Sequence, residues 1–286
     1  MLSLAKRFLR YLKARRKLPL KGYKEGLTSS GAVDDLSDTE LELLNRLLPW
    51  SCFTATLDGR RFGNAAWEGK RGTPQMIPDA RIEVLNQLFD LREKSVLEVG
   101  AFEGVHTIGL SKFAREVVAI DSRIENVVKT IVRTNLFGFK PSVSLCDVEV
   151  DDQFRKLPQV DVIHHVGVLY HLKDPVRHLQ RLAAKARVGM LLDTHYATTE
   201  MASDLYEVSG QVFRYFNYRE SGRKDVFSGM YDHAKWLLMD DIKTLLRDAG
   251  FTDIRVTQDG LQRNGPRVTL YAARKGVMRG NASIHG

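Results

Sequence analysis

From residue 94 onward, short apolar runs alternate with amphipathic segments along the chain. Between the runs, apolar residues recur at helical spacing, as Ile124, Val127, Val128 and Ile131 do on one face of a predicted helix. Alternation of strands and helices is typical of βαβ units, so the pattern predicts an α/β fold with a doubly wound, mostly parallel sheet of seven strands. The predicted strands are residues 95–99, 117–121, 142–147, 160–165, 187–194, 251–257 and 267–273.

Two segments do not follow this rhythm. Residues 27–79 predict an N-terminal extension, with a capped helix in "SDTELELLNRLLPW" and a hairpin in "CFTATLDGRRFG". Residues 196–236 are rich in Tyr and Phe and predict an insertion that caps the site. The main domain is expected over residues 80–275, followed by a loose tail at 276–286.

Charge is concentrated at the N-terminus. The chain has 43 basic and 35 acidic residues, a net charge of +8, and residues 1–24 hold nine basic residues and no acid. The remaining 34 basic residues nearly balance the 35 acids, so the body has a net charge of −1 and lacks the broad positive surface of a nucleic-acid-binding domain. We expect residues 1–26 to form a basic amphipathic arm with three open roles: docking on its own domain, contact with an anionic membrane surface, or contact with tRNA.

The composition also bears on location. No apolar run is long enough for a membrane-spanning helix, and the N-terminus lacks the apolar core of a signal peptide. Cys52 and Cys146 are too few for a disulfide framework or a cysteine metal knuckle. We therefore expect a cytoplasmic protein, with a peripheral position at the inner membrane face as the alternative that the arm offers.

The stretch "VLEVGAFEG", residues 96–104, is a predicted strand that enters a glycine loop. A dinucleotide loop needs a further glycine so that the backbone can approach a pyrophosphate, and here bulky Phe102 lies between Gly100 and Gly104. No Walker lysine follows. The loop therefore suits S-adenosylmethionine (SAM), which carries no phosphate, and Glu98 supplies negative charge near the sulfonium of that ligand.

Acidic residues follow at the ends of the next two predicted strands. Asp121 in "VVAIDSR" can accept both ribose hydroxyls, and an acid in "CDVEV", Asp147 or Glu149, can take the adenine amino group while Val148 packs against the ring. The pairing of Glu98 with Asp121 also suits NAD, so it discriminates poorly between the two cofactors. The three strand ends together predict a nucleoside site at the carboxyl edge of the sheet.

The stretch "VDVIHHVGVLYHLKDPVRHLQRL", residues 160–182, predicts a buried strand that ends at His165 and turns into a helix. It resembles the fourth-strand region of class I SAM-dependent methyltransferases. The order of motifs, through "AGFTDIRV" and "RVTLYAAR", extends the resemblance over roughly residues 80–275. This resemblance implies a Rossmann-like methyltransferase fold and SAM as the cofactor.

A narrower likeness rests on "LLPW" at 47–50, Trp67, "GVLYH" at 167–171 and "GPRVTLYAARK" at 265–275. These motifs are similar to those of the tRNA wobble-uridine carboxymethyltransferase family, which uses carboxy-SAM. Carried over by motif, the resemblance implies cofactor contacts from Trp67, Gly100, Asp121, Ser122, Arg123, Val148, Glu149, Val166, Tyr170 and Arg267.

One feature of that family is missing. In the family, a lysine soon after the Pro-Trp pair acts with the tyrosine and the arginine to hold the extra carboxylate. Here "SCFTATLDG" follows Pro49-Trp50 and contains no lysine. Because charge-assisted contacts are the strong ones, losing one of three weakens carboxylate binding, and we expect SAM rather than carboxy-SAM.

Three residues are candidates for the chemistry of transfer. Methyl transfer is an in-line displacement that needs positioning and exclusion of water, and a hydroxyl acceptor also needs a base. Tyr170, His165 and His195 lie at or just beyond predicted strand ends and are the candidates. His171 is expected to hold the turn into the helix, and no metal is expected because no carboxylate or cysteine has ligand spacing beside "HHVGVLYH".

We therefore predict a SAM-dependent methyltransferase whose acceptor is a glycan, a lipid-linked molecule or a small molecule. A tRNA wobble-uridine carboxymethyl- or methyltransferase is the first alternative. An NAD-dependent oxidoreductase and a SAM-binding protein without catalytic activity are alternatives from other classes. The last stays open because no single residue is indispensable to methyl transfer.

Overall fold

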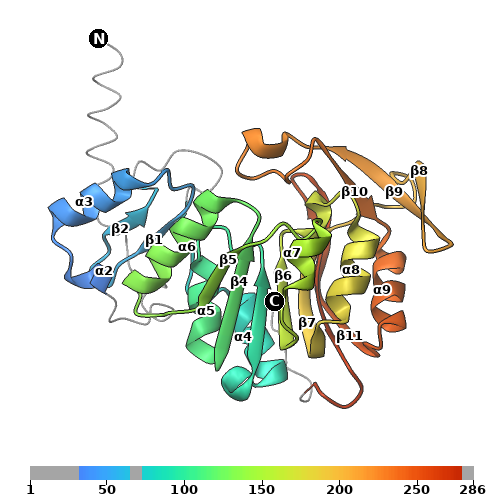
Figure 1. Cartoon of the computed structure of the whole chain (residues 1–286), viewed down its shortest axis with the longest axis horizontal. Coiled ribbons are helices and arrows are strands. Elements are labelled where there is room, and N and C mark those ends of the chain that lie inside the picture. The colour runs from blue at the N-terminus through green and yellow to red at the C-terminus, as the bar shows by residue number, and fades with distance from the viewer. Residues whose placement is uncertain (1–31, 65–72, 279–286) are drawn as a thin grey trace, which may run out of the picture. The chain divides into compact units, whose positions relative to one another are not determined.

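A computed structural model describes residues 32–64 and 73–278 (Figure 1). The chain divides into two compact units. Unit 1 comprises the described residues up to Glu83, together with Ala101–Phe113 and Ile124–Val143. Unit 2 comprises Val84–Gly100, Ala114–Arg123 and the described residues from Ser144 onward. The predicted basic arm (1–26) and Trp67 lie outside the described residues.

Seven strands form one sheet in the order β11-β12-β7-β6-β3-β4-β5. The pairs β3–β4, β3–β6 and β6–β7 are parallel, whereas β12 is antiparallel to both β7 and β11. The predicted mostly parallel, seven-stranded sheet is therefore confirmed. The strands are β3 (Ser95–Val99), β4 (Glu116–Asp121), β5 (Ser142–Leu145), β6 (Val160–Val166), β7 (Ala186–His195), β11 (Asp253–Gln262) and β12 (Gly265–Ala273).

Strand β11 is longer than the sequence predicted. Its antiparallel ladder with β12 continues until Gln262 pairs with Gly265, although the apolar pattern ends near Thr257. Ladder hydrogen bonds use backbone groups alone, so exposed polar side chains do not end a hairpin. The prediction followed side-chain pattern and therefore stopped too early.

The largest core lies in unit 2, on one face of the sheet. Leu97, Ile163 and Met190 stand in register on three neighbouring strands, and all are buried. Apolar residues of three helices cover them. Figure 1 shows these helices in front of the sheet. The helices are α7 (Asp151–Arg155), α8 (Pro175–Ala183) and α9 (Met239–Asp248).

Helix α8 shows why the sequence folds as it does here. Asp174 is its N-cap and accepts a hydrogen bond from the Arg177 backbone N–H, and Pro175 occupies the first turn, where no N–H is needed. On the other face of β7, α4 (Ala80–Phe89) ends close to the strand. A Cβ at Gly189 would lie 2.6 Å from the Phe89 ring, so only glycine allows this approach.

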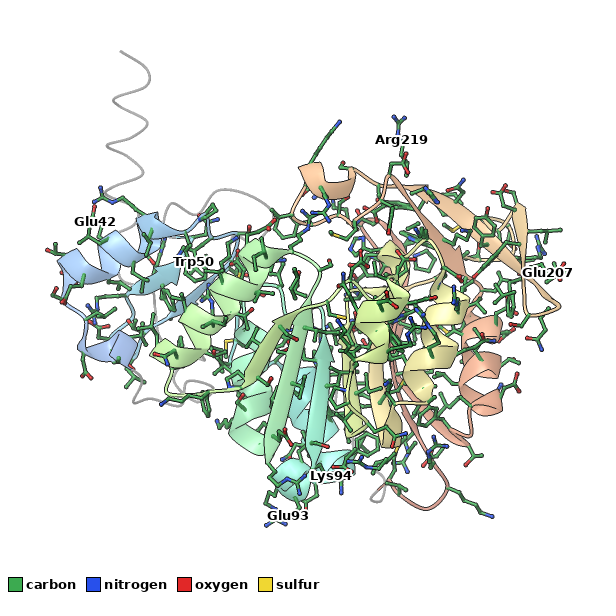
Figure 2. All side chains as sticks on the ribbon, in the orientation of Figure 1. Glu42, Trp50, Glu93, Lys94, Glu207 and Arg219 are labelled. Carbon is green, nitrogen blue, oxygen red and sulfur yellow. The ribbon has the colours of Figure 1, made fainter. Side chains whose placement is uncertain are left out.

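The insertion forms a separate antiparallel sheet in unit 2. Its strands are β8 (Asp204–Val208), β9 (Gln211–Arg219) and β10 (His233–Leu237), in the order β10-β9-β8. A loop with the short 3₁₀ helix η3 (Gly222–Lys224) joins β9 to β10. Arg219 and Glu207 project from this sheet into solvent (Figure 2).

Unit 1 contains the predicted N-terminal helix and hairpin. Helix α3 (Asp38–Leu47) begins with a capping box between Ser37 and Glu40, which satisfies the first backbone N–H groups. Strands β1 (Phe53–Ala55) and β2 (Arg61–Gly63) pair antiparallel. The remaining helices of unit 1 are α2 (Ala32–Asp35), α5 (Val105–Phe113) and α6 (Ile124–Leu136).

Helix α6 differs from the sequence prediction. Val127 is buried, but Ile124, Val128 and Ile131 are 57%, 40% and 48% exposed, so the apolar face that the four share is largely exposed. The helix instead buries polar and charged residues. They are Asn126, Lys129, Thr130, Arg133 and Thr134. The reason lies in a buried carboxylate of the glycine loop, described below.

No helix among the residues that the structure describes is both long enough and apolar enough to span a membrane.

Candidate cofactor and acceptor site

The glycine turn after β3 has a conformation that only glycine accepts well. Gly100 has a φ of +79°, and its N–H donates to the Ile120 carbonyl at 2.9 Å. A Cβ at this position would lie 2.4 Å from Cγ2 of Val168. In unit 1, Gly104 also has a positive φ, and a Cβ there would lie 3.0 Å from the Thr130 Cα. A side chain is therefore poorly tolerated at Gly100 and at Gly104.

Phe102 has a left-handed backbone conformation, with a φ of +52°. Its carbonyl accepts a hydrogen bond from the Thr130 hydroxyl at 3.4 Å, and its side chain packs against the apolar core of unit 1. A bulky residue with positive φ is unusual, and such strain occurs where the surrounding structure fixes the backbone.

Sequence reasoning missed Glu103, which lies in the same loop and is fully buried in unit 1. Its carboxylate accepts hydrogen bonds from the backbone N–H groups of Ser51 (2.7 Å) and Cys52 (3.0 Å), and from Lys129 Nζ (2.9 Å). Arg133 Nη2 lies 3.7 Å away. Burial acts to raise the pKa of Glu103, but Arg133 and Lys129 outweigh it and lower that pKa. In the sequence, the signal for this buried carboxylate was a pair of cations, Lys129 and Arg133, four residues apart on one predicted helix.

Arg133 also contacts two aromatic rings. Its guanidinium carbon lies 4.6 Å from the ring centres of both Trp50 and Phe62. Trp50, labelled in Figure 2, belongs to the Pro-Trp motif of the sequence. The motif therefore contributes to the core of unit 1, together with the glycine-loop carboxylate.

In unit 2, the predicted acids lie at the ends of neighbouring strands. Asp121 Oδ1 accepts a hydrogen bond from the Arg123 N–H at 2.9 Å, and the Cys146 N–H donates to the Asp121 carbonyl. Asp147 Oδ1 accepts from the Glu149 N–H at 3.0 Å, and Val148 between them is buried. Ser122 is half-buried beside Asp121. These residues can present carboxylate oxygens and one apolar surface to a nucleoside.

Glu149 also binds the segment that precedes α8. Its carboxylate accepts a hydrogen bond from the Asp174 N–H at 2.9 Å, just before α8 begins. Burial raises the pKa of Glu149. Asp147 has no such tie to the α8 turn among the contacts of the described residues, so it is the better placed of the two acids for an adenine amino group.

The side chain of Arg123 is occupied elsewhere. Its guanidinium donates to backbone carbonyls of the insertion, including those of Gly222 and Asp225 at 3.0 Å each. The sequence predicted a cofactor contact from Arg123. In the structure the guanidinium donates to carbonyls of the insertion, while the backbone N–H of Arg123 donates to the Asp121 carboxylate.

Beyond β6, two predicted residues converge on Gly167, which has a φ of +76°. A Cβ there would lie 3.7 Å from the Tyr170 hydroxyl and 3.9 Å from Arg267 Nη2. The Arg267 guanidinium lies 5.5 Å from the Tyr170 ring centre. Val166 ends β6 just before this glycine.

Arg267 is also bound to a carboxylate. Asp193 Oδ1 accepts from Arg267 Nε at 2.8 Å and from Arg267 Nη2, and its other oxygen accepts from the Thr269 hydroxyl at 2.6 Å. Asp193 is buried. The positive charge of Arg267 is thus already paired within unit 2.

His195 lies in an aromatic cluster at the end of β7. Its ring stacks on Trp236 at 4.8 Å and meets the Tyr170 ring edge-on at 4.7 Å, while Trp236 also stacks on Tyr218. His195 Nδ1 donates to the Pro266 carbonyl at 3.0 Å, which leaves Nε2 with the lone pair in the neutral ring. Burial lowers the pKa of His195, so this neutral form is favoured.

The structure does not support His165 as a base. Its side chain is fully buried between β6 and α8, with Nε2 2.9 Å from Nε2 of His178. Burial lowers its pKa to about 4. His165 is covered because the last residues of β6 point alternately to two covered faces, and His164 on the other face is buried as well.

His171 and Glu98 have structural surroundings. His171 Nδ1 lies 2.5 Å from Glu220 Oε1 of the insertion, so it fastens the insertion to η2 (Leu169–His171). Glu98 is buried in β3, where it stands in register with His164 of β6.

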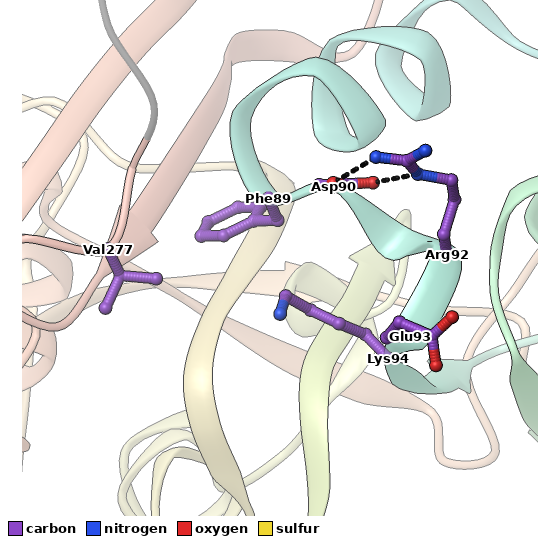
Figure 3. Close-up of a pocket in the computed structure, with 6 residues that line it drawn as sticks. All are labelled: Phe89, Asp90, Arg92, Glu93, Lys94 and Val277. Carbon is purple, nitrogen blue, oxygen red and sulfur yellow. Dashed lines mark hydrogen bonds and ion pairs between the residues drawn. The ribbon is translucent and has the colours of Figure 1, made fainter.

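A surface hollow in unit 2 lies away from these residues. Phe89, Asp90, Arg92, Glu93, Lys94 and Val277 line it (Figure 3). These residues precede β3 or follow β12, so the hollow is at the amino end of β3. In parallel α/β sheets, ligands bind at the carboxyl ends of the strands, and this hollow is not the cofactor site.

The comparisons with known proteins agree with this geometry. A family model described as a methyltransferase domain matches residues 75–256. The chain belongs to the methyltransferase-domain family. SAM is the cofactor of this family, and the glycine turn, the carboxylate of Asp121 and the acids after β5 are compatible with it.

Curated relatives of this methyltransferase-domain protein are named tRNA U34 carboxymethyltransferase. The protein from Vibrio campbellii is 27% identical over 277 residues, which cover 92% of this chain and 76% of that relative. The protein from Cellvibrio japonicus is 27% identical over 173 residues, 58% of this chain and 51% of that relative. This chain therefore matches only about half the length of several relatives.

A solved structure shares the fold. The N-terminal domain of EvdMO1, determined in the presence of S-adenosylhomocysteine (SAH) and D-fucose, has a TM-score of 0.67 and 22% sequence identity. The match covers 84% of this methyltransferase-domain chain and 98% of that one.

Proposed function

We propose that the chain transfers a methyl group from SAM to a hydroxyl of a glycan, a lipid-linked molecule or a small molecule. The observation that carries this proposal is His195. Its Nε2 holds a lone pair beside Tyr170, at the strand edge where the cofactor of this fold is bound. The EvdMO1 domain, crystallised with SAH and a sugar, supports a sugar hydroxyl as one acceptor.

The donor is proposed to be SAM rather than carboxy-SAM. A carboxylate on the donor needs uncompensated positive charge, and Asp193 already pairs with Arg267. Tyr170 still offers a hydroxyl near Gly167, but one neutral donor does not replace a missing cation.

Different residues bind the cofactor, remove the proton and exclude water. Asp121 and Asp147 orient the nucleoside through its ribose and its amino group. SAM supplies the electrophilic methyl group when bound. His195 Nε2 takes the proton of the acceptor hydroxyl, while the Pro266 carbonyl holds the Nδ1 proton and thus fixes the tautomer. Trp236 and Tyr218 exclude water beside the histidine.

The proposal is tested by following tritiated methyl groups from SAM into sugar nucleotides and phenols, with unmodified tRNA in parallel. His195→Gln should lower kcat by about 10²–10⁴-fold, the usual contribution of a positioned base, and leave SAH affinity nearly unchanged. His233→Gln is the matched control, because His233 is partly exposed on the insertion. Because the pKa of His195 is lowered, the wild-type rate should stay high as pH falls to 6.5 and decline only below that value.

Incorporation into tRNA alone would instead favour a second candidate, carboxymethyl or methyl transfer to the tRNA wobble uridine. The convergence of Tyr170 and Arg267 on Gly167 and the names of the curated relatives support this candidate. In that case the arm at residues 1–26 is proposed as the tRNA contact, and tRNA binding should weaken steeply with salt and fail after its deletion.

A further inference from the structure

The loop between β9 and β10 is fastened to the end of β4 by Arg123. The guanidinium donates to five backbone carbonyls of residues 222–229, at distances of 3.0 to 3.4 Å. Four of these contacts share Nη2, which has only two hydrogens, so the oxygens surround one cationic nitrogen. The side chain is buried, and hydrogen bonds to a buried cation are among the stronger ones.

The same loop is fastened a second time, to the segment after β6. Glu220 pairs with His171, and its other oxygen accepts from the Ser228 hydroxyl and from the Gly229 N–H. At Gly229 a Cβ would lie 2.4 Å from the His171 carbonyl oxygen, so the two backbones approach closely. The loop is thus held at η2 as firmly as at Arg123.

The two attachments involve segments that follow different strands of the sheet. In the sheet order, β4 and β6 are the neighbours of β3, and parallel strands end at one edge. Arg123 follows β4 and His171 lies beyond β6, so the loop contacts the segments that follow both neighbours of β3, and Ser228 and Gly229 take part in both attachments. Residues 220–229 therefore connect the two segments that flank the end of β3, where the chain enters the Gly100 turn.

We propose that residues 220–229 form a strap across the cofactor and that Arg123 is the positioning residue that holds it closed. The backbone N–H of Arg123 donates to Asp121, the proposed ribose ligand, while its side chain holds the strap. Occupation of Asp121 and closure of the strap are thus linked through one residue. SAM entry and SAH release then require the contacts between Arg123 and the strap to open.

The proposal rests on the cofactor site described above and does not depend on the acceptor. It assigns Arg123 a role other than direct contact with the cofactor. Lysine cannot replace it fully, because an ammonium lacks the planar fork that reaches several carbonyls at once.

The test compares Arg123→Gln and Arg123→Lys with wild type, using SAH as the probe. Stopped-flow measurement of SAH dissociation and hydrogen exchange of peptides within 219–232 are the two readouts. We expect Arg123→Gln to raise the dissociation rate roughly tenfold to a hundredfold, as one or two charge-assisted hydrogen bonds would, and to raise exchange in this loop. Arg123→Lys should recover part of both effects.

Arg223→Gln is the matched control, because Arg223 belongs to the same loop and its side chain is exposed. It should behave as wild type. Glu220→Gln weakens the second attachment and should raise loop exchange even if the Arg123 variants fold poorly. Unchanged exchange at 219–232 in Arg123→Gln, or exchange that rises equally in α8 and α9, would overturn the strap. Failure of wild type to bind SAH would instead refute the cofactor site, since the exchange readout needs no ligand.

Discussion

At the scale of single residues, two positions in the glycine loop show what the cofactor edge requires. Gly100 combines a positive φ with a close approach to Val168, so a side chain is excluded both by its own backbone and by its neighbour. Glu103 is a buried carboxylate that two cations and two backbone N–H groups satisfy. One residue shapes the turn, and the other fixes the loop within unit 1.

Gly100→Ala should abolish measurable SAM binding, because its Cβ would lie 2.4 Å from Val168 Cγ2. Gly210→Ala is the control: its φ is +78°, almost the same, but nothing lies within 4 Å of the added carbon. The control should lose about 1 kcal/mol of stability from the backbone alone and keep its SAM affinity. Isothermal titration and thermal unfolding of both variants separate the two effects. Normal SAM binding by Gly100→Ala would show that the cofactor lies elsewhere.

Glu103→Gln should lower the free energy of unfolding by about 3–5 kcal/mol, since it leaves Lys129 and Arg133 as buried cations without their carboxylate. Adding Lys129→Met should recover part of that loss. Glu42→Gln breaks an exposed pair with Arg46 and should change stability by less than about 1 kcal/mol. Urea unfolding measures all three. Equal small losses in Glu103→Gln and Glu42→Gln would mean that the buried cluster contributes little.

At the scale of elements, packing between β6 and α8 contains an unusual pair. His165 and His178 are fully buried and face each other through their Nε2 atoms, so one must donate and the other accept. Burial lowers the pKa of both, and Arg181 and His165 add to the effect at His178. The pair holds strand and helix together only while at least one ring is neutral.

The pair predicts a loss of stability in mild acid. In the unfolded chain a histidine binds its proton near pH 6.5, whereas His165 in the fold does so near pH 4. The unfolded state therefore binds more protons in that interval, and stability falls as pH decreases from 6.5 to 4, by about 3 kcal/mol for His165 alone. Urea unfolding over this range should show a smaller slope for His165→Leu/His178→Leu. An unchanged slope, equal to that of the exposed control His233→Gln, would refute this assignment.

Elements with a strong apolar pattern were predictable from sequence. All seven strands overlap the apolar runs that predicted them. For the buried strands β3, β6 and β7 the reason is that a strand covered on both faces needs apolar residues along its length, whereas β5 is mostly exposed. Helix α6 occurs where its apolar spacing predicted a helix, but its buried face was not predictable, since that face is set by Glu103, a partner that lies 26 residues from Lys129. Hydrophobic periodicity identifies the apolar face of a helix. It cannot show that a buried acid, here Glu103, pairs with the polar face of α6 and so buries it.

The places of the proposed site residues in the fold were predictable to a similar extent. Asp121, Asp147 and Gly100 follow from strand ends and the glycine turn, both of which are local in sequence. The pairing of Asp193 with Arg267 joins residues 74 positions apart, and the attachment of Arg123 to the insertion joins residues about 100 apart. Such contacts depend on the order of strands in the sheet, which the sequence alone does not state.

At the scale of the whole molecule, the central claim is that a methyltransferase-domain chain with relatives named as carboxymethyltransferases uses plain SAM. The family match establishes the domain, and the acids and glycine turn suit a nucleoside without phosphate. The choice of donor depends on charge at one place, where Asp193 neutralises Arg267 and residues 51–59, directly after the Pro-Trp pair, contain no lysine.

Calorimetric titration of the full chain with SAM, carboxy-SAM and NAD tests this claim most directly, with Asp193→Asn measured alongside wild type. We predict that wild type binds SAM at least about tenfold more tightly than carboxy-SAM, the equivalent of about 1.4 kcal/mol, and does not bind NAD. Asp193→Asn should narrow that difference, because it leaves the charge of Arg267 without its carboxylate partner. Tighter binding of carboxy-SAM than of SAM by the wild-type chain would contradict the account.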